Sequence, residues 1–314
     1  MKNGEIEVSG IMAAWASRAV HGCLALKHGE NALILVDEPL PAAREALLTQ
    51  AREARVNELW SFTLYAPSRP VLKFPSSILK LARKLDAVLI FLSSLDLVLE
   101  QSALWPALRA FQQAGTRVGF GLIPDTGVIE QIVFTNHEAI AARAAALAER
   151  LRGCSTIRIT APLGTDLRMS VAGREWKADT GFIQSRGLYG HFPAGEVCIA
   201  PVEDSVEGVL MIDGSLSGLM LSEPVRVVIE KGRTAAIEGG PGADYLREVW
   251  RRGEEQPNGE WSRVIGGLGI GLNPGVRLRG DLAGDRKTAG TVHITWGRND
   301  LTGGKNLAPL QING

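Results

Sequence analysis

Two short apolar runs, Ala32-Leu33-Ile34-Leu35-Val36 and Ala87-Val88-Leu89-Ile90-Phe91-Leu92, decide the fold class of the first half of the chain. Neither run alternates polar with apolar residues. Continuous apolar runs of this length are typical of strands that are buried on both faces of a parallel sheet. We therefore predict a parallel sheet with helices on both of its faces.

The segments around these two runs alternate between helical and strand patterns. Helices are expected at Ile11–Lys27, Ala42–Ala54, Ile78–Lys84, Ala103–Ala114 and Asn136–Arg152, and further strands at Glu58–Phe62 and Val118–Leu122. Thr135 or Asn136 is a suitable cap for the last helix. This alternation predicts a doubly wound, Rossmann-like α/β domain over residues 1–153.

The pattern changes near Gly153, where short strands with glycine turns begin. Strands are expected at Thr156–Thr160, Leu167–Val171, Val197–Ala200, Gly208–Asp213, Val225–Glu230, Thr234–Glu238 and Gly290–Trp296, with one helix at Gly242–Arg252. The glycine-rich run Gly266–Gly271 lacks dinucleotide-binding spacing, and we interpret it as a tight turn with close backbone approach. Residues 154–314 are therefore predicted to form a β-rich α+β domain.

The composition limits the class of protein. The chain has 314 residues with 34 basic and 34 acidic side chains, so its formal net charge is zero. This balance argues against nucleic acid as a partner. The longest apolar stretch, Ala87–Leu95, is too short to span a membrane, and the N-terminus does not resemble a signal peptide, so the cytoplasm is the expected location. The three cysteines, Cys23, Cys154 and Cys198, are expected to be small buried side chains rather than disulfides.

Four stretches of the second half occur in an order that points to a known family. They are Ala161–Leu167, Phe192–Gly214, Leu268–Pro274 and Gly290–Gly297. Together they resemble the M29 family of thermophilic-type metallo-aminopeptidases, which also has dihydroxypyridine ring-cleaving dioxygenases among its relatives. The motifs cover roughly residues 155 to 314, and the resemblance over residues 1 to 150 is only architectural.

The resemblance implies a metal centre of carboxylates and histidines, most of which this chain has lost. Glu196 matches a carboxylate ligand and His293 a histidine ligand. Gly267 stands where metal-binding members have Glu, and Gln311 and Asn313 stand where they have His and Asp. A catalytic zinc site needs about three protein ligands, so two retained donors predict a vestigial site and no cofactor.

Amide side chains that replace metal ligands still donate and accept hydrogen bonds, as a peptide backbone requires. Our hypothesis is therefore a non-catalytic peptide-binding protein, a pseudo-aminopeptidase that holds a peptide or peptide-like ligand in an interdomain cleft and forms a homodimer. Modification of peptide natural products in bacteria is the setting that the family chemistry suggests. The expected ligand-binding residues are Glu196, His191, Asn273, Arg277, His293, Lys305, Asn306, Gln311 and Asn313.

Two alternatives stay open. The chain is an aminopeptidase-like hydrolase or a ring-cleaving dioxygenase if a rearranged metal site exists, and Asp300 is then the nearest further carboxylate in the sequence. It is an inactive structural subunit if it pairs with an active paralogue.

Overall fold

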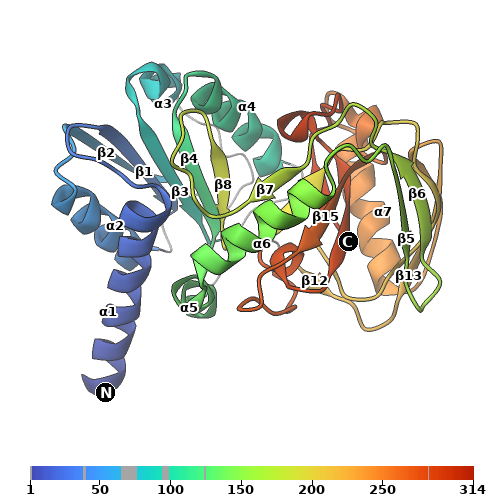
Figure 1. Cartoon of the computed structure of the whole chain (residues 1–314), viewed down its shortest axis with the longest axis horizontal. Helices are drawn as coiled ribbons and strands as arrows, with labels where there is room; N and C mark the ends of the chain where they lie inside the picture. Colours follow the sequence, from blue (N-terminus) through green and yellow to red (C-terminus); the bar gives the residue numbers. More distant parts are fainter. Residues whose placement is uncertain (1, 38–39, 65–75, 94–98, 124, 282) are drawn as a thin grey trace. The chain divides into compact units, whose positions relative to one another are not determined.

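The structure is a computed structural model, and it describes residues 2–37, 40–64, 76–93, 99–123, 125–281 and 283–314. The chain folds into two compact units (Figure 1). The first is built mainly from Met1–Asp96, Ala103–Ala141 and Thr180–Ala194, and the second mainly from Ala142–Asp179 and Gly195–Gly314. The two units thus alternate along the sequence, and a domain boundary at residue 153 stays a prediction.

The first unit contains a five-stranded parallel sheet, which confirms the predicted fold class. Its strand order is β2-β1-β3-β4-β8. The strands are β1 (Asn31–Asp37), β2 (Glu58–Leu64), β3 (Ala87–Leu92), β4 (Arg117–Leu122) and β8 (Tyr189–Phe192). Strand β8 comes from the segment predicted as β-rich, and it extends the sheet beside β4 through pairs such as Phe120 with His191.

The helices of the amino-terminal half follow the predicted alternation. They are α1 (Lys2–Ser17) with the π-helical turn η1 (Arg18–Cys23), α2 (Pro41–Glu53), α3 (Ser76–Leu81) with the short 3-10 turn η2 (Ala82–Lys84), α4 (Leu99–Gln113), α5 (Thr126–Phe134) and α6 (His137–Arg150). The amide of Ala139 donates to the Asn136 side chain at 2.9 Å, so Asn136 caps α6 as expected. Helix α5 was not predicted.

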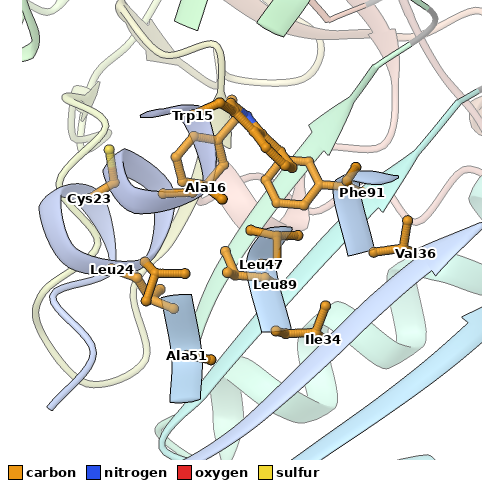
Figure 2. Close-up of a cluster of buried hydrophobic side chains, with 14 of the residues drawn as sticks. Trp15, Ala16, Cys23, Leu24, Ile34, Val36, Leu47, Ala51, Leu89 and Phe91 are labelled. Atoms are coloured by element: carbon orange, nitrogen blue, oxygen red, sulfur yellow. The ribbon is translucent and has the colours of Figure 1, made fainter. Parts of the chain in front are cut away.

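Alternate residues of the buried strands pack against opposite layers of helices. Ile34, Val36, Leu89 and Phe91 belong to a core with α1 and α2, in which the Trp15 and Phe91 rings meet edge to face at 4.7 Å (Figure 2). Because successive strand side chains point to opposite faces, the residues between them lie on the α3 and α4 side of the sheet in Figure 1. Both faces are therefore covered, and this explains the continuous apolar runs.

The second unit is built on two antiparallel sheets. One has the order β14-β13-β10-β6-β5 and the other β17-β16-β15-β9-β7, with a small β11-β12 ribbon beside them. The strands are β5 (Thr156–Thr160), β6 (Asp166–Ser170), β7 (Lys177–Asp179), β9 (Glu196–Ile199), β10 (Glu207–Ile212), β11 (Ser215–Leu216), β12 (Leu219–Met220), β13 (Val225–Glu230), β14 (Arg233–Glu238), β15 (Ile265–Gly271), β16 (Val292–Gly297) and β17 (Gln311–Asn313).

Helix α7 (Pro241–Glu254) packs on the core of this unit, where the Trp250 and Trp296 rings lie 5.8 Å apart. Three short 3-10 turns complete the unit: η3 (Gly259–Trp261), η4 (Asp285–Lys287) and η5 (Asp300–Thr302). None of the helices formed by described residues combines the length and the apolar character needed to cross a bilayer.

Two sequence-based expectations are wrong. The run Gly266–Gly271 is not a turn but most of β15, which lies in the middle of its sheet between β9 and β16. The expected close backbone approach is present, because a Cβ atom at Gly271 would lie 2.0 Å from the Thr288 carbonyl oxygen, and a Cβ atom at Gly269 would lie 2.0 Å from the His293 ring. Cys154 is exposed rather than buried, whereas Cys23 is buried and Cys198 half-buried.

Candidate functional site

Strand register in the second unit brings together residues that are far apart in the sequence. Asp179 on β7 pairs with Glu196 on β9, and Glu196 pairs with Gly271 on β15. Two residues before Gly271 on β15, Gly269 lies opposite His293 on β16. Gly269 has no side chain, so the imidazole of His293 lies over its Cα and comes close to Glu196. The His293 Nε2 and Glu196 Oε2 atoms are 3.5 Å apart.

A buried lysine occupies the position between the two carboxylates. The Lys287 ammonium donates to Asp179 Oδ2 at 2.5 Å and to Glu196 Oε1 at 2.6 Å, and its side chain is 0% exposed. We call Asp179, Glu196 and Lys287 the lysine–carboxylate cluster. The backbone fixes this lysine as well, because the Lys287 carbonyl accepts from the amide of Asn273 at 2.8 Å.

The charges of the cluster determine its protonation. Burial alone would raise the pKa of Glu196, but Lys287 and then Arg286 more than offset this and lower that pKa to about 2. Burial lowers the pKa of His293 to about 4, so its imidazole is neutral at pH 7. The cluster is therefore a carboxylate pair held by an internal cation, with a neutral histidine beside it.

Cys198 follows Glu196 on the same strand but has no reactive thiolate. Burial, together with the charge of Glu196, raises the pKa of its thiol to about 12. Reactive cysteines have lowered thiol pKa values. Cys198 is therefore a protonated packing residue.

The predicted residues Asn273 and Arg277 follow β15. Asn273 is fully buried, and its Oδ1 accepts from the amide of Gly275 at 2.9 Å, so it shapes the turn that positions Lys287. The side chain of Arg277 is exposed. A ligand-binding role for either residue stays a prediction.

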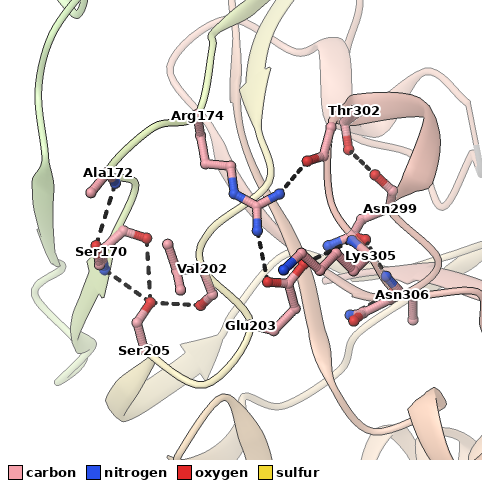
Figure 3. A network of polar contacts seen from close by, with 12 residues as sticks. Ser170, Ala172, Arg174, Val202, Glu203, Ser205, Asn299, Thr302, Lys305 and Asn306 are labelled. Atoms are coloured by element: carbon pink, nitrogen blue, oxygen red, sulfur yellow. Dashed lines mark hydrogen bonds and ion pairs between the residues drawn. The ribbon is translucent and has the colours of Figure 1, made fainter.

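Lys305 and Asn306 belong to a polar network in the second unit (Figure 3). The amide of Lys305 donates to Glu203 Oε1 at 2.8 Å, and Glu203 also pairs with Arg174 at 2.7 Å. Asn306 is fully buried, and its amide donates to Asn299 Oδ1 at 2.8 Å. These contacts hold the segment between β16 and β17, while a role in ligand binding stays a prediction.

Gln311 and Asn313 lie on β17 beside β16. Gln311 pairs with Gly297, and Asn313 pairs with Thr295, whose hydroxyl donates to Asn313 Oδ1 at 2.8 Å. The further candidate Asp300 accepts two hydrogen bonds from Arg298, at 2.6 and 3.0 Å, and is thereby held as an ion pair.

A cavity of about 350 Å³ opens in the second unit beside the cluster. Its apolar wall includes Leu210, Ile212, Val292 and Ile294. Of the predicted binding residues in the described chain, His293 and Asn313 line this cavity and the others do not.

His191 lies on β8 and belongs to the first unit. Its Nε2 atom is 3.0 Å from the Tyr189 hydroxyl, and its ring lies edge-on to that of Phe120. Because His191 and Glu196 belong to different units, the expectation that they share a site stays a prediction.

Sequence reasoning missed two members of the lysine–carboxylate cluster. Asp179 ends a strand of only three residues, and Lys287 ends the 3-10 turn η4, whose sequence Asp285-Arg286-Lys287 carries no motif. The proximity of Asp179 to Glu196 follows only from the pairing of β7 with β9, which the sequence does not reveal. Lys287 does not stand at any of the metal-ligand positions that the family motifs imply. A search restricted to those positions could therefore not have found it.

The residues present in the second unit do not fit the metal ion that the family resemblance implies. Glu196 and His293 are the only retained donors, Gly267 offers no side chain, and Lys287 already occupies Glu196 Oε1. Among the described residues of this unit, Asp179 and Glu196 are two acidic side chains that could contribute to a metal site, and no third His, Cys, Asp or Glu of the same unit joins them closely enough. A divalent centre at these carboxylates would need displacement of the lysine.

Fold and site together define a two-unit α/β protein whose second unit holds a buried lysine ammonium between two carboxylates. The sequence profile of the 2,5-dihydroxypyridine 5,6-dioxygenase family matches residues 12–305. The chain belongs to that family.

Individual relatives agree with this assignment. The chain is 25% identical over 239 residues to the 2,5-dihydroxypyridine 5,6-dioxygenase of Pseudomonas putida, which covers 71% of this chain and 66% of that protein. The solved structure of 2,5-dihydroxypyridine dioxygenase from Pseudomonas putida aligns with a TM-score of 0.76 at 18% identity, over 96% of this chain and 90% of that chain.

AmpT from Thermus thermophilus aligns with a TM-score of 0.70 at 18% identity, over 97% of this chain and 92% of that chain. The similarity to the aminopeptidase-like proteins is thus one of fold, whereas the sequence match is to the dioxygenase family. This corrects the emphasis of the sequence-based resemblance, in which the aminopeptidases came first.

Proposed function

We propose that this protein is a metal-independent small-molecule-binding member of the dioxygenase family, with its ligand in the cavity of the second unit. The observation that carries the proposal is the fully buried Lys287 ammonium, which bridges Asp179 and Glu196. An ammonium so close to both carboxylates repels a divalent cation and occupies one oxygen of each carboxylate.

The cavity of the second unit supports small-molecule binding, a function that needs no metal ion. Its volume of about 350 Å³ lies within the ~300–1,000 Å³ that is usual for small-molecule sites. It combines an apolar wall with a few polar groups, among them His293 and Asn313. A peptide ligand in an interdomain cleft is a narrower hypothesis, and the comparisons give it no support over other small molecules.

The second candidate function is ring cleavage by a rearranged metal site. The family membership favours it, because the matched relative is named a dioxygenase. This function requires Lys287 to leave the carboxylates when metal and substrate bind.

Dioxygen uptake distinguishes the two functions. We would incubate the protein with Fe(II) and 2,5-dihydroxypyridine and follow oxygen with an electrode, using buffer with Fe(II) as the blank. Metal-independent binding predicts uptake equal to the blank. Uptake above the blank that is abolished by Glu196→Ala would establish the dioxygenase and refute our proposal.

A further inference from the structure

The lysine–carboxylate cluster is also a set of groups that can react with one another. The Lys287 Nζ atom lies 2.5 Å from Asp179 Oδ2 and 2.6 Å from Glu196 Oε1. Because a carbon–oxygen bond is about 1.2 Å long, this nitrogen lies within about 3.7 Å of the Asp179 carboxyl carbon. Reacting atoms positioned for attack are separated by about 3–3.5 Å. The amine and the carboxyl group are therefore arranged to form an amide.

The three side chains of the cluster are shielded from water. The Lys287 side chain is 0% exposed, that of Glu196 4% and that of Asp179 10%. A buried ion pair loses the hydration that stabilises charged groups in water. Condensation to an amide removes two of the buried charges and releases one water molecule. Burial therefore shifts the balance between ions and amide toward the amide.

Backbone contacts hold the reacting groups in place. Asp179 and Glu196 are paired residues of β7 and β9, and the Asp179 carbonyl accepts from the Gly195 amide at 3.0 Å. The Lys287 amide donates to the Gly284 carbonyl at 2.7 Å. Groups that a fold holds together in this way react as though their concentration were about 10⁵–10⁸ M. The fold thus supplies the proximity that amide formation requires.

The two carboxylates have different surroundings, and these assign their roles. Glu196 is the more deeply buried, and its Oε2 lies 3.5 Å from His293 Nε2. Burial raises the pKa of Glu196, whereas the Lys287 charge lowers it. As the ammonium gives up its proton, that pKa rises, and Glu196 becomes a suitable proton acceptor. Asp179 is the more exposed acid, so a water molecule can leave from it.

We propose that Lys287 and Asp179 form an intramolecular amide bond, an isopeptide bond, with Glu196 as the proton relay. Freshly folded chains hold the ion pair that the structure describes, and the bond forms from it. The Lys287 ammonium passes a proton to Glu196, and its Nζ attacks Asp179 Cγ. One Cγ–O bond then breaks, and Glu196 transfers two protons from the nitrogen to the departing oxygen, which leaves as water. The amide keeps one N–H, so atoms and charges balance without a co-reactant.

This bond would link two positions that are 108 residues apart in the sequence. A cross-link between distant positions restricts the unfolded chain and so stabilises the fold. The inference goes beyond the proposed function, because it does not depend on what the cavity binds. It also bears on the second candidate function, which requires Lys287 to leave the carboxylates, since an amide bond to Asp179 would prevent that movement.

The mass of the protein tests the bond directly. The full chain would be incubated in its folded form, then denatured and measured by intact mass spectrometry, with a sample kept in urea throughout as the control. We expect the folded sample to lose one water, about 18 Da, and the urea sample to keep the mass of the sequence. Digestion with trypsin should then release a branched peptide that joins Asp179 to Lys287.

Lys177 provides a matched control in the same chain. Its Nζ lies 3.8 Å from Glu175 Oε2, but the two side chains are 51% and 86% exposed. Lys177 should therefore stay unmodified and be cleaved by trypsin in every sample. The substitution Asp179→Ala should abolish the loss of water, and Glu196→Gln should slow it about 100-fold, as expected when a proton relay is removed.

Each outcome decides for or against the bond. An unchanged mass after incubation of the folded chain would overturn the proposal and leave a simple buried ion pair. A loss of water without the branched peptide, or a branch on Glu196 in place of Asp179, would overturn it as well. Should the two variants not fold, the mass and the branched peptide of the unsubstituted chain decide alone.

Discussion

At the scale of single residues, the central feature is a lysine ammonium that balances the charge of two carboxylates, where the family resemblance implies a metal ion. Lys287 is completely buried, which is rare for a lysine unless acidic partners surround it. Asp179 and Glu196 supply those partners, at 2.5 and 2.6 Å. Two carboxylates brought together in a protein interior repel each other unless one takes up a proton or a cation lies between them, and here the chain itself provides the cation.

Removal of that cation should be strongly destabilising. Lys287→Met keeps the length of the side chain but leaves two buried carboxylates without their partner. Breaking a buried pair in this way costs about 3–5 kcal/mol. Urea unfolding at pH 7 would measure the loss. Lys305→Met serves as the control, because that lysine is exposed, and its effect should stay within about 0.5 kcal/mol. Equal losses in the two variants would show that the buried ion pair contributes nothing special.

At the scale of elements, strand β15 (Ile265–Gly271) positions the site through its glycines. A Cβ atom at Gly269 would lie 2.0 Å from His293 Cε1, closer than any van der Waals contact allows. The glycine is required because it is the partner of His293 across the strand pair, and the imidazole takes the space above it.

Alanine at this glycine should therefore destabilise the protein. We expect Gly269→Ala to cost about 1–3 kcal/mol, the usual range for overpacking a core. The same substitution at Gly10, an exposed position of α1 with open space around it, should stabilise by roughly 0.5–1 kcal/mol because alanine favours the helix. Thermal unfolding of both variants measures whether the first is destabilised and the second stabilised. A neutral Gly269→Ala would mean that the His293 ring does not lie where the structure has it.

In the first sheet, an ion pair whose strength depends on pH links the start of β1 to β4. Glu30, just before β1, accepts from Arg117 of β4 at 2.9 and 2.6 Å. Burial would raise the pKa of Glu30, but the hydrogen bonds from Arg117 and from the Lys27 amide lower it below its ordinary value of 4.5. The resulting stabilisation is present above the pKa of the unfolded chain and is lost as the pH falls through the folded pKa.

A substitution isolates this effect from the other carboxylates. The difference in unfolding free energy between the unsubstituted protein and Glu30→Gln should be largest near pH 7 and shrink below about pH 4.5. Glu45→Gln, at a side chain that is 58% exposed, is the control and should give a small difference at every pH. A Glu30→Gln difference that grows on acidification would contradict the direction of the pKa shift.

Local patterns predicted the elements well and the site only in part. The sequence was sufficient to predict β1 and β3 from their apolar runs and the cap of α6 by Asn136, because these features depend on residues that are close in sequence. Strand β15 was misread, since seven residues with four glycines look like a turn until the partners on both sides are known. Lys287 could not be predicted, because its burial depends on the pairing of β7 with β9, far away in the sequence.

At the scale of the whole molecule, each compact unit has its own core. The core of the first unit includes Trp15 and Phe91, and that of the second includes Trp250 and Trp296. The lysine–carboxylate cluster belongs entirely to the second. Separate cores of this kind commonly open as separate cooperative units.

Hydrogen exchange can test this division. Lys287→Met should lower the protection of amides in β9, β15 and β16 by a large factor, and should leave β1 and β3 close to their values in the unsubstituted protein. Mass spectrometry of peptides from both cores, under native conditions, would measure the two regions in one experiment. A uniform loss of protection over all five strands would contradict independent cooperative units.

The most direct test of the central claim is the metal content of the protein. Chains purified without chelators from cells supplied with iron, zinc and manganese would be analysed by elemental mass spectrometry, before and after incubation with each ion and desalting. An internal cation in the form of Lys287 predicts far less than one metal per chain in every sample. One tightly held metal per chain, lost in Glu196→Ala, would contradict it.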